Sequence, residues 1–350
     1  MSVTDKSKVI VPKGFYGKAN VLQGFNPETE SIVDITTVRN TSGTIVNEAG
    51  NIETVPANVP RRDHANSKCG ALLVEPQRTN LLQYSEDFNI DWSTVNGTIT
   101  ANTKISPDGT QSADTLTSDG GSVIADKSCI KKSNAIPANG VYSRSIFIKK
   151  GNTRYGWISS LGTSFTDTNG VIFDFDNEVI TEIHNQNPPN TTLGASFKKY
   201  KNGWYRLTFV QNAFTSGVTD GFSVGMTKSP NTIQEHDAGD FIHIWGAQLE
   251  EGSIPTSYIP TTGAAATRNA DEFNIDLNSQ NVPEQYALLF DVDATGGRLL
   301  MESTGAGFDL DLKNAGRFAM LVDLNTITFK FPDNGQPQTE LLVYSYGAHN

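Results

Sequence analysis

Apolar and polar residues alternate in many short runs along this chain, which is the pattern of β-strands. In one run the alternation places Phe241, His243 and Trp245 on one face of a strand and the intervening isoleucines on the other. A second run, Val141–Lys149, begins with alternation and then becomes apolar, as a strand entering a core would. Gly, Asn, Asp or Pro bounds these runs, and none has the period of a helix. The pattern predicts an all-β fold, an antiparallel β-sandwich of the jelly-roll type.

The density of these strand signals divides the chain into three parts. Residues 1–68 hold only short apolar patches, such as Val9–Val11, which cannot bury much surface alone. We expect this N-terminal segment to be extended and to lie against a neighbour or a partner subunit. Residues 69–268 carry the predicted sandwich, and residues 269–350 carry a second, smaller β domain whose strands begin at Tyr286.

Composition supports this organisation and limits the kinds of partner that the protein can have. The chain has 350 residues, of which 37% are hydrophobic and only 19% charged, a mixture that favours strands and turns. A formal net charge of -11 argues against nucleic acid, since a phosphate backbone requires clustered Lys and Arg. No apolar run approaches the roughly 20 residues of a membrane span, so we expect no membrane insertion. The two cysteines, Cys69 and Cys129, are expected to be reduced thiols in a protein folded in a reducing cytoplasm.

Five blocks of sequence, in a fixed order, carry a likeness to a known family. They are Gly70–Phe88, Trp92, Ser106–Thr110, Asn202–Arg206 and Trp245–Gly252. Together they resemble a phage virion-associated jelly-roll family that is similar to carbohydrate-binding modules. Proteins of that family occur in tail fibres, head fibres and baseplate appendages. The likeness covers the predicted sandwich, and neither the N-terminal segment nor the C-terminal strands share it.

The resemblance implies an architecture and a set of partners. It implies a two-sheet jelly roll in which an opening strand, Thr79–Tyr84, lies beside a closing strand, Phe241–Leu249. It also implies a homotrimer located in the virion, attached to other virion proteins through the N-terminal segment. A host cell-surface glycan is the ligand that the family suggests.

The resemblance also suggests calcium, which in carbohydrate-binding modules often lies where the opening and closing strands meet. Glu86 and Asp87 follow the opening strand, and Glu250 and Glu251 end the closing one. Carboxylate oxygens are ligands that suit calcium. No local loop has the alternating acidic spacing of a dedicated calcium site, so we otherwise expect no cofactor.

Four aromatic residues are candidates for a sugar-binding surface: Trp157, Tyr155, Trp204 and Tyr205. The C–H faces of sugars stack on aromatic planes, and Trp157 and Tyr155 share a strand face because they are two residues apart. The alternative is that these rings fill the sandwich core. We favour that alternative for Trp204 and Trp245, because both belong to the blocks that resemble the family's framework.

Enzymatic chemistry has little support in the sequence. The pairs Asp174 with Asp176 and Asp309 with Asp311 could act as the two carboxylates of a glycosidase, but acidic residues are common at strand ends. No phosphate loop is present. We therefore expect a non-enzymatic structural or adhesion component of a phage particle. The alternatives are a purely architectural subunit (a head fibre, a capsid decoration protein or a baseplate connector) and, with less support, a glycan depolymerase.

Overall fold

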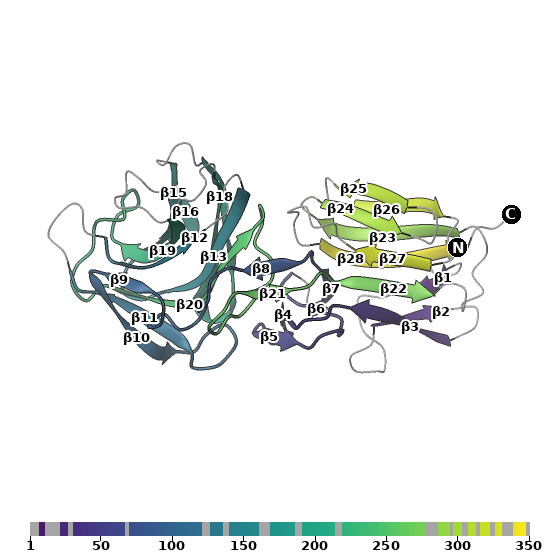
Figure 1. Ribbon diagram of the computed structural model, residues 1–350, viewed down its shortest axis with the longest axis horizontal. Helices are drawn as coiled ribbons and strands as arrows, with labels where there is room; N and C mark the ends of the chain where they lie inside the picture. Colours follow the sequence, from purple (N-terminus) through teal and green to yellow (C-terminus); the bar gives the residue numbers. More distant parts are fainter. Residues whose placement is uncertain are drawn as a thin grey trace. The chain divides into compact units, whose positions relative to one another are not determined.

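The structure is a computed structural model. It describes residues 7–10, 22–26, 31–66, 70–120, 127–135, 140–160, 169–185, 191–213, 219–276, 286–294, 297–302, 307–312, 316–322, 326–330 and 339–347. Across these residues the fold is all-β with antiparallel sheets, as predicted (Figure 1). None of them forms a helix long and apolar enough to span a lipid bilayer.

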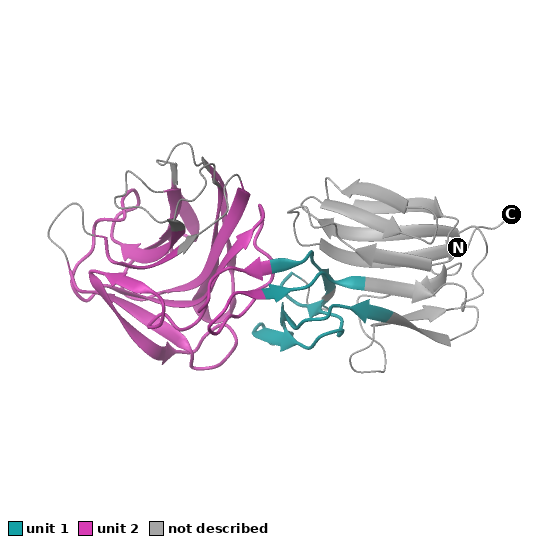
Figure 2. Cartoon of the chain, in the orientation of Figure 1, with its two compact units in different colours: residues 1–78, 267–350 teal, residues 79–266 magenta. Residues whose placement is uncertain are grey.

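The chain forms two compact units, coloured separately in Figure 2. One comprises residues 79–266 and the other residues 1–78 together with 267–350. The first, which we call the sandwich unit, contains all four tryptophans of the chain. The second, which we call the terminal unit, is built from both ends of the sequence.

The sandwich unit is made of two antiparallel six-stranded sheets. Sheet I has the order β10 (Gly97–Lys104), β11 (Ala113–Ser118), β20 (Phe241–Glu251), β13 (Gly140–Lys150), β18 (Trp204–Ala213) and β17 (Thr191–Lys199). Sheet II has the order β16 (Val179–Asn185), β15 (Asn169–Asp174), β14 (Tyr155–Ser159), β19 (Thr219–Thr227), β12 (Cys129–Ala135) and β9 (Ser93–Val95). The chain crosses between the sheets repeatedly, for example from β11 to β12 and from β12 to β13.

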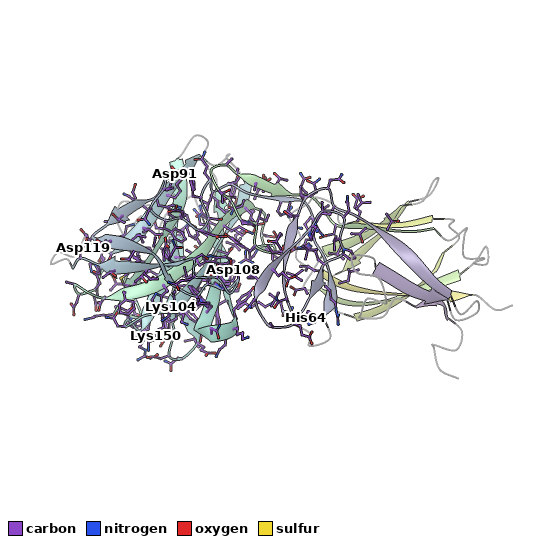
Figure 3. The ribbon with its side chains drawn as sticks, turned by 90° about the horizontal axis from the view of Figure 1, so that it is seen from below. His64, Asp91, Lys104, Asp108, Asp119 and Lys150 are labelled. Atoms are coloured by element: carbon purple, nitrogen blue, oxygen red, sulfur yellow. The ribbon has the colours of Figure 1, made fainter. Side chains whose placement is uncertain are left out.

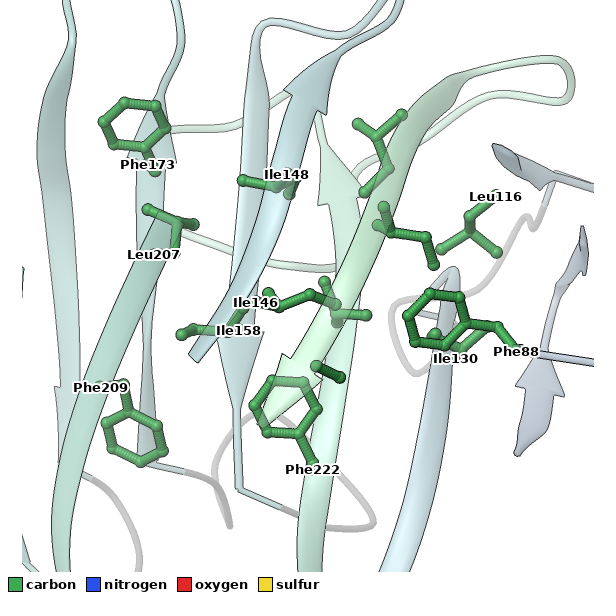
Figure 4. Packing of buried hydrophobic residues seen from close by; sticks show 14 of the residues in the cluster. Phe88, Leu116, Ile130, Ile146, Ile148, Ile158, Phe173, Leu207, Phe209 and Phe222 are labelled. Atoms are coloured by element: carbon green, nitrogen blue, oxygen red, sulfur yellow. The ribbon is translucent and has the colours of Figure 1, made fainter. Parts of the chain in front are cut away.

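The core of the sandwich unit lies between the two sheets (Figure 4). Sheet I contributes Ile146, Ile148 and Leu207, and sheet II contributes Ile158 and Phe222, all of them fully buried. At about 25 cal/mol per Å² of apolar surface, burial on this scale is the main stabilising contribution to the unit. Alternation along each strand then determines which side chains remain for the outer faces of the sheets.

The closing strand β20 changes phase at Gly246. Ile242 and Ile244 face the core before this residue, and Ala247 and Leu249 face it after. Gly246 has a φ of 63°, and a Cβ there would lie 2.9 Å from a Phe147 ring carbon. The ladder between β13 and β20 shifts register at the same place. This β-bulge requires glycine, because few other residues adopt that backbone conformation or fit that space.

The opening segment lies beside the closing strand, as expected. The Leu81 amide donates to the Leu249 carbonyl at 2.8 Å, and the Ala247 amide donates to the Ser85 carbonyl at 2.8 Å. The regular strand is shorter than predicted: only β8 (Arg78–Asn80) is extended and paired, with β21 (Ala266–Arg268). The Asn80 side chain holds the two segments together by donating to the Ala247 carbonyl at 3.1 Å.

The terminal unit joins segments that the sequence places in separate parts. Its largest sheet has twelve strands: β1 (Ser7–Ile10), β2 (Leu22–Asn26), β3 (Ser31–Val38), β6 (Arg62–Asp63), β7 (Ala71–Val74), β22 (Glu272–Asp276), β23 (Tyr286–Ala294), β24 (Gly297–Glu302), β25 (Gly307–Leu312), β26 (Gly316–Val322), β27 (Thr326–Lys330) and β28 (Thr339–Gly347). Strand β3 pairs with β22, and β1 pairs with β28. A small hairpin, β4 (Gly43–Val46) and β5 (Ile52–Val55), completes the unit.

These pairings differ from the predicted division into residues 1–68, 69–268 and 269–350. The N-terminal segment and the C-terminal strands share one sheet, so neither is a separate part. The physical reason is that the short N-terminal strands have unpaired backbone groups and little apolar surface of their own. They satisfy both needs by pairing with C-terminal strands of the same chain.

A buried cluster of charges organises the terminal unit. Asp271 accepts hydrogen bonds from Arg39 Nη1 at 2.8 Å and from the Glu75 amide at 3.0 Å, and it forms an ion pair with Arg61. Glu75 in turn pairs with Arg61 at 2.7 Å and with Arg268 at 3.2 Å. The side chains of these residues are at most 1% exposed. Burial alone lowers the pKa of Arg61, but the two carboxylates more than offset it, so Arg61 stays charged.

We predict that Asp271→Asn destabilises the terminal unit by about 3–5 kcal/mol, because it leaves buried guanidinium groups without a counter-charge. The measurement is denaturant unfolding of the full chain followed by far-ultraviolet circular dichroism. Tryptophan fluorescence reports only the sandwich unit and monitors its integrity in the same samples.

Asp176→Asn is the matched control, because it removes a carboxylate that pairs with Lys150 on the surface. Exposed pairs contribute about 0–1 kcal/mol, so this variant should unfold close to the parent chain. If Asp271→Asn lowers the free energy of unfolding by no more than the control does, the organising role of the cluster is contradicted.

Candidate functional site

The aromatic residues of sheet I belong to the interior of the protein. Tyr205 faces the core between the sheets, and Trp204 lies on the opposite face of the same strand. On that outer face, the Phe147 ring centroid lies 5.3 Å from that of Trp245 and 6.0 Å from that of Tyr258. Sheet I therefore buries rings on both faces.

Residues 252–262, which follow the closing strand and which we call the strap, cover this second aromatic cluster. Thr256 of the strap donates its amide to Glu250 at 3.0 Å, and Arg206 donates to the Thr256 carbonyl at 2.7 Å. The strap also contributes Tyr258, whose ring centroid lies 4.7 Å from that of Trp245. Burial raises the pKa of Glu250, although its hydrogen bonds with Thr256 lower it. Glu250 thus fastens the strap and does not face a calcium site.

Trp157 and Tyr155 lie on the outer face of sheet II, where they are also covered. They pack with Cys129, Ile172 and Ile233 in a small apolar cluster. The indole of Trp157 donates to the Met226 carbonyl at 3.1 Å. Ile233 comes from the segment that follows β19, so a loop closes this face as the strap closes the other.

The predicted sugar-stacking surface is therefore wrong for the structure described. Trp157 and Trp204 are 0% exposed, Tyr155 is 7% exposed and Tyr205 is 6% exposed. A ring without an open face cannot stack on a sugar. The strand faces of these rings follow from alternation, but the loops that cover them do not. The core alternative applies to all four rings and to Trp245.

The buried rings instead position the loop between β10 and β11. The Trp204 indole donates to the Ile105 carbonyl at 3.0 Å, and the Trp245 indole donates to Ser112 Oγ at 3.0 Å. Between these anchors, Ser106 closes a tight turn, accepting from the Gly109 amide and donating to the Thr110 carbonyl. Blocks of sequence that lie far apart therefore fix one loop on the outer face of sheet I.

This loop forms one wall of an open hollow of about 360 Å³. We call it the lysine groove; its lining residues are Thr103, Lys104, Ile105, Gln111, Lys149 and Asn202. Lys104 ends strand β10, and Lys149 comes from β13. Asn202 belongs to a short 3-10 turn (Lys201–Gly203) directly before β18, and its carbonyl accepts a hydrogen bond from Lys149. Lys104 is visible on the sandwich unit in Figure 3.

A row of side chains across sheet I continues from the groove. In the strand ladders Lys149 is paired with Trp204 on one side and with His243 on the other, and His243 is paired with Thr115. The His243 Nδ1 and Thr115 Oγ1 atoms are 2.8 Å apart. Burial, together with the charges of Lys104 and Lys149, lowers the pKa of His243 to about 4. His243 is therefore neutral at pH 7, and the lysines provide the positive charge.

Neither lysine of the groove has a carboxylate partner. Across the described part of the chain, no Asp or Glu forms an ion pair with Lys104 or Lys149. Lys150, the next residue along β13, points to the other face and pairs with Asp176. Burial lowers the pKa of Lys149, and the neighbouring charge of Lys104 lowers it too. The two ammonium groups thus repel each other across the groove.

A second hollow, of about 290 Å³, is lined by acidic residues and not by lysines. Glu86, Asp87 and Asp114 line it, so two of the four predicted calcium residues, Glu86 and Asp87, do come together. The Tyr258 hydroxyl already donates to Glu86 at 2.8 Å, and Asp114 accepts from the Asn102 amide at 2.9 Å. No three Asp, Glu, His or Cys side chains within the described ranges converge as metal ligands. The donor set, without Glu250, does not fit the predicted calcium ion.

Asp174 and Asp176 are both engaged in ion pairs, and Asp174 is buried. Arg154 donates to Asp174 from Nε at 3.1 Å and from Nη2 at 2.7 Å. These hydrogen bonds lower the pKa of Asp174 to about 2, which is unsuited to a general acid. Asp176 pairs with Lys150. The side chains of Asp309 and Asp311, on β25, lie outside the described residues.

We predict that Asp114 makes the sandwich unit less stable as the pH rises from about 4 to about 6. Burial raises the pKa of Asp114 in the folded chain to about 6, from 3.8, although the amides of Asn102 and Phe88 lower it. The folded state therefore holds a proton that the unfolded state has lost, and this advantage disappears above about pH 6. Urea unfolding followed by tryptophan fluorescence should show that the free energy of unfolding declines over this pH range by at most about 3 kcal/mol. Asp114→Asn should remove this decline.

Asp119→Asn serves as the control, because Asp119 is an exposed carboxylate beside the same sheet. This variant should retain the decline. An equal decline in the parent chain and in Asp114→Asn would contradict the prediction.

The lysine groove and the acidic hollow thus differ in charge, and the two lysines of the groove have no carboxylate partner among the described residues. No protein-family model matches the chain, and no curated protein matches it.

Proposed function

We propose that the chain is a non-enzymatic structural and adhesion component of a bacteriophage particle, which contacts host surface glycans through the sandwich unit. The observation that carries the adhesion role is the lysine groove, an open hollow that carries two lysines on a sheet whose other face is buried. A rigid support of this kind presents its side chains without a large ordering cost on binding. The five sequence blocks that resemble virion-associated proteins support the location in a particle.

A shallow groove is suited to weak binding that is repeated many times. Its volume of about 360 Å³ is at the lower end of the roughly 300–1,000 Å³ of ligand pockets. Linked copies convert weak single contacts into firm attachment, because later contacts form at high effective concentration. We propose a homotrimer in the virion, with the N-terminal segment and the C-terminal strands that pair with it directed to other virion proteins.

A purely architectural subunit is the second candidate, and the structure offers two observations in its favour. The candidate sugar-stacking rings are buried. In addition, Val179 and Ile183 on β16 and Leu193 on β17 are 44%, 51% and 54% exposed. These strands are the edges of sheets II and I, where another subunit could pair. A depolymerase has no such support, because Asp174 is held in an ion pair with Arg154.

We predict that mass spectrometry of purified particles detects the full chain and that antibodies against it label those particles. The same antibodies should reduce adsorption to host cells, because adhesion requires the labelled surface to be free. Antibodies against a host cytoplasmic protein are the control. Labelling without any loss of adsorption would favour the architectural candidate, and absence of the chain from particles would overturn both.

A further inference from the structure

We propose that the lysine groove binds the anionic group of an acidic saccharide, with Lys104 and Lys149 as the two cationic contacts. This inference rests on the proposed adhesion function and names the class of glycan that the groove selects. The bound group is a carboxylate or sulfate carried on a sugar ring.

The first argument is charge. The chain as a whole carries a net charge of -11, so a polyanion is repelled from most of its surface. Four other lysines of the sandwich unit, Lys132, Lys150, Lys199 and Lys228, each have a carboxylate partner. Lys104 and Lys149 have none among the described residues, and their charges act on each other. An anion between them would relieve that repulsion and form charge-assisted hydrogen bonds.

The second argument is the chemistry of the remaining lining. Ile105 is 45% exposed, an apolar surface against which the C–H face of a sugar can lie. Gln111, Asn202 and Thr103 supply amide and hydroxyl groups that pair with sugar hydroxyls. A simple inorganic anion would leave the apolar and the neutral polar surface without contacts. An acidic sugar would contact the lysines, the apolar surface and the neutral polar groups.

The third argument is preorganisation. The Asn202 carbonyl holds Lys149, and the Trp204 indole holds the Ile105 backbone. The rings therefore support the groove from below without touching the ligand. A nucleic acid is a poorer fit, because it requires a longer basic track and exposed rings for base stacking, and the groove has neither.

The test is isothermal titration calorimetry of the full chain at low salt with tetragalacturonate, a chondroitin sulfate tetrasaccharide and neutral maltotetraose. We expect binding of the acidic saccharides and at least tenfold weaker binding of maltotetraose. Lys104→Gln combined with Lys149→Gln should weaken binding of the acidic saccharides at least tenfold. Raising the salt concentration should weaken it in the parent chain and much less in the double variant.

Lys150→Gln is the matched control, because it removes the same charge one residue away on the opposite strand face and should change binding less than twofold. Unchanged tryptophan fluorescence verifies that each variant is folded. Equal binding of acidic and neutral saccharides, equal binding of single-stranded DNA, or no effect of the double variant would overturn the proposal. If antibodies still block adsorption while no acidic saccharide binds, this inference fails and the adhesion function stands.

Discussion

The structure of the sandwich unit depends on one constraint: sheet I buries side chains on both of its faces. Its inner face needs the second sheet, and part of its outer face needs the strap. The strap is held by polar contacts, since Gln248 accepts from the Ile259 amide at 2.6 Å and Arg206 donates to the Thr256 carbonyl. Buried polar groups of this kind stabilise a fold only when they are bonded, so the strap can close in one arrangement. No residue of the strap lines the lysine groove, which lies on the open part of that face.

Burial separates the charges of the protein into two classes. Inside, charged groups have partners: Asp271 lies among arginines, and Glu250 is bonded by Thr256. On the open part of sheet I, Lys104 and Lys149 share a groove with neutral groups only. Burial without a partner is costly, whereas a solvated lysine pays little for remaining unpaired. Unpaired charge therefore survives at the surface, where a ligand can reach it.

Alternation along the strands allowed the all-β fold and the faces of β20 to be predicted. Ile242 and Ile244 do lie in the core, and His243 lies on the other face. Exposure could not be predicted in the same way, because it depends on loops that are distant in sequence. Trp157 is covered by Ile233. The lysine groove had no local signal either, since Lys104 and Lys149 meet only through the order of the strands. Gly246 was the one local clue to the bulge, and its meaning depends on the neighbouring Phe147 ring.

Conflicting demands on the tryptophans explain why the framework residues are not the residues proposed to bind a ligand. A ring that stacks on a sugar must keep one face in water, and it then contributes less to the core. Trp204 and Trp245 are fully enclosed and bond the loop between β10 and β11 through their indole nitrogens. They therefore fix the position of Ile105 and of the groove wall while leaving contact to side chains that cost little to expose. On the proposed function, Lys104 at the end of β10 and Gln111 in the following loop can change to suit another glycan without disturbing the sheet that carries them.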